Sequence, residues 1–141
     1  MRNINLGRVI LGGLLAGVVM NVGEFVLNMV VLKNVWNEAM QALNRPSLDS
    51  TSPTMFIILS FFLGIMAVWV YAAIRSRFGA GPWTAICAGL VVWALASLFP
   101  SASMLPISLF PRRLLFYTTV WQFFELPIAT LVGAWIYREE A

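Results

Sequence analysis

The stretch GVVMNVGEFVLNMVV, residues 17–31, decides the fold, because it is an apolar run that includes one glutamate and two asparagines. A bilayer core about 30 Å thick is crossed by about 20 apolar residues in a helix. Polar side chains inside such a helix are costly unless they find partners. Asn21, Glu24 and Asn28 therefore predict polar partners on another helix.

The composition of the chain points to lipid as its solvent. Of its 141 residues, 60% are hydrophobic and 11% are charged, whereas soluble domains carry about 25% charged residues. The net charge of +3 comes from residues at the ends of apolar runs, so nucleic-acid binding is not expected. One cysteine, Cys87, and no histidine leave neither a disulfide framework nor the usual metal ligands and general base. We therefore expect no catalytic residue, metal or cofactor, and hence no enzyme.

Four apolar segments, at about 9–32, 54–74, 82–99 and 114–137, are long enough to cross a bilayer. They predict an all-α membrane protein, with an antiparallel four-helix transmembrane bundle as a single domain over residues 1–141. Gly79 is a typical helix terminator after the second segment.

Two connections between the segments are longer than a turn. In residues 33–53 the apolar side chains have the spacing of a short amphipathic helix, which we expect at the membrane interface between spans 1 and 2. These side chains are Val35, Trp36, Ala39, Met40 and Leu43. Residues 99–111, FPSASMLPISLFP, contain three prolines but remain apolar, which predicts an interfacial or shallowly re-entrant loop.

The basic residues at the ends of the spans indicate an orientation. We expect a cell membrane, most simply a bacterial inner membrane, with both termini in the cytoplasm. This orientation places Arg2, Arg8, Arg75, Arg77 and Arg138 in the cytoplasm and Lys33, Arg45, Arg112 and Arg113 outside.

Spans 1 and 4 carry matching stripes of small and polar residues. Gly13, Gly17, Asn21, Glu24 and Asn28 follow each other by four, four, three and four positions along span 1. Read backwards, span 4 repeats these steps with Gly133, Ala129, Glu125, Gln122 and Thr118. If the two helices are antiparallel, the stripes pair in this order, and the numbers of each pair add up to 146. The small residues would allow close helix packing, and the polar residues would form a seam.

The pairing places each glutamate opposite a carboxamide, which can both donate and accept hydrogen bonds. No Lys or Arg lies within the spans, so at least one of Glu24 and Glu125 is expected to be protonated at neutral pH. Pro127 predicts a kink beside Glu125. Two interpretations follow: a polar clasp that joins two helices, or a proton- or cation-binding site.

Residues 32–40 contain the pattern W-x-x-A-M, formed by Trp36, Ala39 and Met40. Together with the four spans, this segment resembles a widespread family of small uncharacterised bacterial membrane proteins, which implies no particular activity. The chain is also similar, by analogy, to the small multidrug transporters, in which a glutamate in the first of four helices is essential. Glu24 would take that part, but the second intramembrane glutamate, Glu125, and the long first loop depart from that pattern.

We therefore expect a non-enzymatic multi-pass membrane protein that associates with itself or serves as an accessory subunit of a larger membrane complex. Membrane lipid would surround it, and the small residues of spans 2 and 3 would offer the docking face. These residues are Ser60, Gly64, Ala85 and Gly89. One alternative is a small proton- or cation-coupled transporter that uses Glu24 and Glu125. A second alternative is a lipid- or quinone-binding protein with its pocket under the proline-rich loop.

Overall fold

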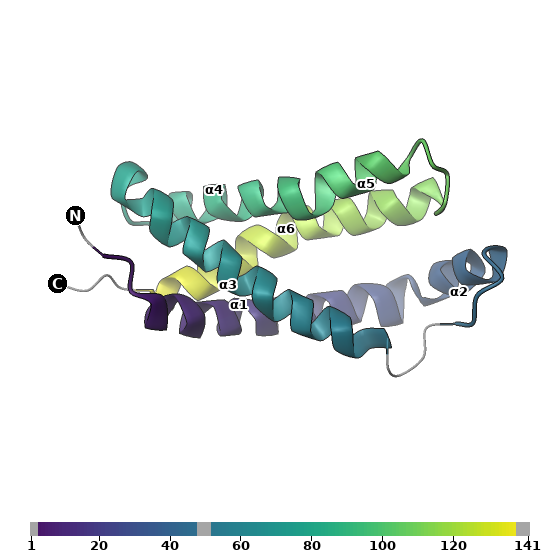
Figure 1. Cartoon of the computed structure of the whole chain (residues 1–141), viewed down its shortest axis with the longest axis horizontal. Coiled ribbons are helices and arrows are strands. Elements are labelled where there is room, and N and C mark those ends of the chain that lie inside the picture. Colours follow the sequence, from purple (N-terminus) through teal and green to yellow (C-terminus); the bar gives the residue numbers. More distant parts are fainter. Residues whose placement is uncertain (1–2, 48–51, 138–141) are drawn as a thin grey trace.

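The computed structural model describes residues 3–47 and 52–137 (Figure 1), and these residues form helices and turns with no strand. Arg2 and Arg138, two of the basic residues used to predict the orientation, lie outside the described residues. The helices are α1 (Leu6–Phe25), α2 (Lys33–Ala42), α3 (Ser52–Phe78), α4 (Pro82–Trp93), α5 (Phe99–Met104) and α6 (Arg112–Ile136). Two π-helical segments, η1 (Val26–Val31) and η2 (Ala94–Leu98), continue α1 and α4.

Four helical segments are long and apolar enough to cross a membrane, which supports a multi-pass membrane protein. Their bounds are Leu6–Val31, Pro53–Phe78, Pro82–Met104 and Arg112–Ile136. The second is longer than predicted and ends at Phe78, because Gly79 adopts a φ of +86°, which is the left-handed conformation that terminates helices.

The prediction of a proline-rich loop over residues 99–111 is wrong for the first half of this segment. The helix that begins at Pro82 continues through η2 and α5 to Met104, past Pro100. Proline has no N–H and its ring crowds the preceding turn, and the wider π turn just before Pro100 relieves that conflict. Only the segment after Met104 turns the chain back into α6.

The amphipathic segment after the first span is a helix, α2, as its spacing predicts. Its Ala39 is buried, and Val35 and Trp36 pack against a small apolar cluster that includes Leu27 of η1 and Leu114 of α6. The α2 helix therefore packs against the start of α6 through apolar side chains.

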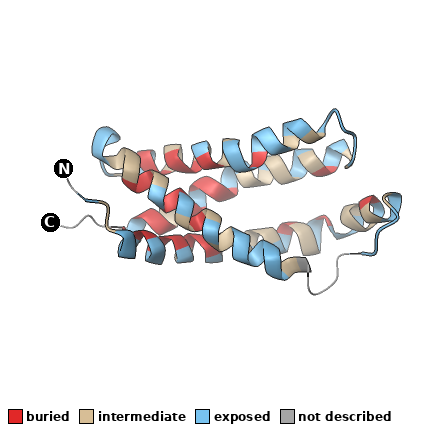
Figure 2. Cartoon of the chain, in the orientation of Figure 1, coloured by how far each residue is buried: buried red, intermediate tan, exposed pale blue. Residues whose placement is uncertain are grey.

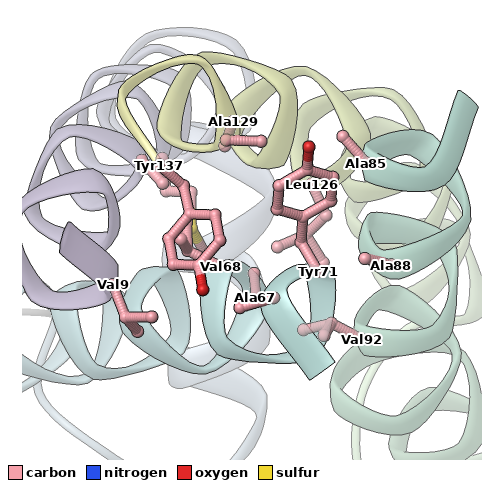
Figure 3. Packing of buried hydrophobic residues seen from close by; sticks show 14 residues of the cluster. Val9, Ala67, Val68, Tyr71, Ala85, Ala88, Val92, Leu126, Ala129 and Tyr137 are labelled. Atoms are coloured by element: carbon pink, nitrogen blue, oxygen red, sulfur yellow. The ribbon is translucent and has the colours of Figure 1, made fainter. Parts of the chain in front are cut away.

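The main core lies in the half of the molecule that contains the described chain ends, where most buried residues are found (Figure 2). Figure 3 shows small residues of several helices packed around Tyr71 of α3 and Tyr137, which follows α6. The backbone N–H of Asn5, just before α1, donates to the Tyr137 hydroxyl at 3.4 Å. The start of α1 therefore lies beside the end of α6, and these two helices run in opposite directions.

The glycine stripe of α1 packs against α3, which corrects the predicted pairing with α6. A Cβ on Gly13 would overlap the backbone of Ile65, and one on Gly17 would overlap Phe61. A Cβ on Gly64 would in turn overlap the backbone of α1 at Gly13 and Gly17. These glycines therefore allow α1 and α3 to touch through their backbones.

A neighbouring face of α1 packs against α6. Gly12 and Gly133 are so close that a Cβ on either would overlap the carbonyl oxygen of the other, and Ala129 is buried in the same core. Gly133, one of the predicted packing residues of span 4, therefore meets α1, but through Gly12 rather than Gly13. The predicted pairing of Gly13 with Gly133 is wrong because α1 lies between α3 and α6 and presents a different face to each of them.

Three of the four small residues predicted to form a docking face on spans 2 and 3 pack inside the chain instead. Gly64 packs on α1, as described above. A Cβ on Gly89 of α4 would lie 2.6 Å from the Cα of Pro127 in α6, and Ala85 is buried in the main core. The α6 helix continues through Pro127 from Arg112 to Ile136.

The α1–α3 contact predicts the effect of adding one methyl group. Gly64→Ala should destabilise the protein, because forcing two backbones apart by overpacking costs up to about 3 kcal/mol, against a gain in helix propensity of about 1 kcal/mol. Gly7→Ala is the control, since Gly7 is exposed and its Cβ would make only an ordinary contact, at 3.5 Å from Asn5 Oδ1. Thermal unfolding in detergent measures both, and equal midpoints for the two variants would contradict the packing.

Candidate functional site

The candidate site is a polar cluster where the end of α1 meets the middle of α6. Gln122 of α6 donates from Nε2 to Glu24 Oε1 at 2.6 Å. The register predicted from the sequence pairs these two residues, and the structure places them together. α1 after Arg8 and α6 after Arg113 contain no basic residue that could form an ion pair with Glu24. Amide groups therefore serve as its hydrogen-bond donors.

The π-helical segment η1 supplies the second donor to Glu24. Asn28 donates from Nδ2 to Glu24 Oε2 at 2.6 Å and to the Glu24 backbone carbonyl at 2.9 Å. Its own Oδ1 accepts a hydrogen bond from Trp36 Nε1 of α2 at 2.8 Å. A chain of hydrogen bonds therefore runs from α2 through η1 and Glu24 to α6.

Glu125 is the buried member of the cluster, with 7% of its surface exposed. Its Oε1 accepts a hydrogen bond from Trp121 Nε1, one turn earlier on α6, at 3.2 Å. Its Oε2 is buried without a hydrogen-bond partner among the described residues. The carboxyl groups of Glu24 and Glu125 are close enough to interact.

The approach of Glu125 to α1 depends on Gly23. A Cβ at this position would overlap Glu125 Oε1 and would lie 3.0 Å from its Cδ. Gly23 is therefore the gap in the surface of α1 that admits the carboxyl group beside Glu24.

Two predicted pairs are wrong in the structure. Asn21 donates to the carbonyl of Gly17 at 2.9 Å and to that of Ile57 in α3 at 3.4 Å, rather than facing Glu125. Thr118 donates to the carbonyl of Leu114 at 2.9 Å and not to Asn28. Short polar side chains in helices often bond to their own preceding turn, which competes with partners on a neighbouring helix.

The sequence reasoning missed three residues of the site. Trp121 precedes Glu125 by four positions, a spacing that places both on one helix face, so this signal was available. Trp36 was assigned to the apolar face of its helix, but its indole N–H also needs a partner. Gly23 gives no sequence signal of its own, because its role depends on where the α6 side chain arrives.

The remaining chemistry of the described residues is sparse. They contain no group of three His, Cys, Asp or Glu that could hold a metal ion. Two open, mostly apolar depressions, of about 260 and 290 Å³, lie along η2, α5 and the start of α6. Trp36 lines the first and Arg112 the second.

The chain was compared with known proteins. No family model, no curated protein and no solved structure matches it.

The Glu24–Gln122 hydrogen bond predicts a measurable coupling energy. A double-mutant cycle with Glu24→Ala and Gln122→Ala should give about 0.6 kcal/mol, the average for hydrogen bonds between transmembrane helices. Glu24→Gln should fold nearly normally, because glutamine can still accept from Gln122. Unfolding in mixed detergent measures each variant.

The exposed ion pair between Arg113 and Glu38 is the control for this cycle. Its coupling should fall as salt is added, because exposed charges are screened, while the coupling of the half-buried Glu24–Gln122 pair should change less. A zero coupling energy for Glu24 and Gln122 would show that their contact does not hold the helices together.

Proposed function

We propose that this chain is a non-enzymatic multi-pass protein of the cell membrane that works by association, either with its own copies or as an accessory subunit of a larger membrane complex. In this proposal the spans form an antiparallel four-helix bundle, and the polar cluster holds α1 to α6. The observation that carries the proposal is that most residues of each span are not buried by the rest of the chain. Only 28–39% of each spanning window is buried within the chain.

The polar side chains support a role in holding the fold rather than in catalysis. Glu24, Asn28, Gln122 and Trp36 bond to one another, and such bonds between helices stabilise their packing in lipid. Nucleophilic catalysis needs an activating base, and the chain has no histidine to supply one.

The outward surfaces of the spans support association. Large apolar side chains cover them, among them Val18, Phe62, Val91 and Phe116. Lipid can cover such surfaces, and so can the spans of other chains, which pack by van der Waals contact. A unit of four helices encloses little volume by itself, so a further chain is the simplest way to complete a functional assembly.

The proposed orientation places both termini in the cytoplasm, with α2 at the opposite interface. Arg8, Arg75 and Arg77 lie at the end of the molecule where α1 begins and α3 ends, and basic residues next to short loops favour the cytoplasm. The amphipathic spacing of α2 and its ion pair between Glu38 and Arg113 support an interfacial position for that helix.

The association predicts a particle larger than the monomer. In mild detergent, native mass spectrometry should find either multiples of the 15.7 kDa chain or a fixed stoichiometry with one partner. A monomer at every protein concentration, in every mild detergent and in nanodiscs would contradict the proposal.

Cysteine crosslinking in native membranes can locate the contact, with Cys87→Ser as the background. Variants on the outward faces should include one that forms a disulfide-linked species, and Ala88→Cys, which is fully buried, is the control. The outward variants are Val18→Cys, Phe62→Cys, Val91→Cys and Phe116→Cys.

Proton- or cation-coupled transport is the second candidate function, and it is favoured by Oε2 of Glu125, which has no hydrogen-bond partner in the part of the chain that the structure describes. Ionisable groups inside a membrane are candidates for ion pathways. In proteoliposomes, a pH gradient should then drive a flux that Glu24→Gln or Glu125→Gln abolishes. Glu38→Gln is the matched control, because Glu38 is an exposed glutamate on α2.

A further inference from the structure

We propose that the Glu24–Glu125 pair is a binding site for a single proton, which is carried on Oε2 of Glu125, and that it is not a site for a metal cation. The proton comes from water. When it is bound, Glu125 is a neutral carboxylic acid beside the carboxylate of Glu24. The inference concerns binding alone. It therefore stands whether or not the chain moves protons across the membrane.

The burial of Glu125 is the first observation that points to a bound proton. Its side chain is more than nine-tenths buried, and Oε2 has no hydrogen-bond partner among the described residues. A buried carboxylate oxygen without a partner is costly, because it gives up its hydration and gains no hydrogen bond in return. A proton on this oxygen removes the charge, and the interaction between the two carboxyl groups becomes attractive instead of repulsive.

The donors around the pair select a proton over a metal ion. Both oxygens of Glu24 already accept from amide N–H groups, those of Gln122 and Asn28. Oε1 of Glu125 accepts from the indole of Trp121. A hard metal cation such as Mg²⁺ or Ca²⁺ requires six or more oxygen ligands, whereas within the described residues one carboxyl oxygen of this pair, Oε2 of Glu125, has no partner. A proton requires one oxygen.

Along the described parts of α1 and α6, no basic residue lies near the carboxyl pair, because α1 after Arg8 and α6 after Arg113 contain none. Among the groups of the described residues, Glu24 of α1 is the charged group that acts on Glu125. The nearest basic residue along α6 is Arg113, twelve positions away, and it pairs with Glu38 of α2. In α4 and α3 the titratable side chains are Cys87, Tyr71, Arg75 and Arg77, and the two arginines lie in the last turn of α3.

Infrared difference spectroscopy of the protein in lipid vesicles tests the inference. Raising the pH should remove the carbonyl-stretch band of a protonated carboxylic acid, and exchange into D₂O should shift this band. Labelling glutamate carboxyl carbons with ¹³C should shift it further, which assigns it to glutamate in the unmodified protein. The measurement therefore does not depend on whether a variant folds.

Two substitutions assign the band to one residue. Glu125→Gln should remove it, because glutamine keeps an acceptor for Trp121 but cannot hold the proton. Glu38→Gln should leave it unchanged, and circular dichroism checks the helix content of both variants. Gly23→Ala displaces the Glu125 carboxyl without removing it, so the pH midpoint of the band should move.

Several outcomes would overturn the inference. One is the absence of a titrating glutamate band in the unmodified protein, and another is a band that survives Glu125→Gln. A band whose amplitude depends on Na⁺ or K⁺, when compared with a large organic cation, would show a metal site instead. A titrating band without any flux in proteoliposomes would support the proton site and reject transport. The failure of one proposal can therefore be distinguished from the failure of the other.

Discussion

A carboxyl group inside an apolar helix must find a partner, and the rest of this structure depends on how Glu24 finds one. Its two oxygens accept from Gln122 of α6 and from Asn28 of η1, so one side chain joins the end of the first span to the middle of the last. Without these donors the carboxyl group of Glu24 would lack partners inside an apolar helix, where ionisable groups are costly. This requirement sets the register of α1 against α6 at the polar end of their contact.

At the other end of the same contact, the constraint is steric. Gly12 and Gly133 meet backbone to backbone, and Gly13 and Gly17 do the same with α3. In lipid, helices gain little from burying apolar side chains, so close contact of this kind is what holds them together. The α1 helix therefore contacts both neighbours through its glycines and hydrogen-bonds to both nearer its end, to α3 through Asn21 and to α6 through Glu24.

The polar cluster links segments that are far apart in the chain. Trp36 of α2 bonds to Asn28, Asn28 bonds to Glu24, and Glu24 lies beside the buried Glu125. A change in the proton content of the carboxyl pair would alter the charge at the centre of this chain of hydrogen bonds. The clasp and the proton site are thus two properties of one cluster.

The sequence alone determined the four spans, the helix after the first span and the pairing of Glu24 with Gln122, because these follow from apolar length, helical spacing and the need to satisfy buried polar groups. Only the tertiary structure decided which neighbour each face of α1 meets. The glycine stripe and Asn21 face α3, and Glu125 enters at Gly23, because α1 is packed by two helices at once. A register derived from one helix pair cannot show which residues of the α1 stripe contact a third helix instead. It also cannot show that the third span continues past Pro100 through a π-helical turn.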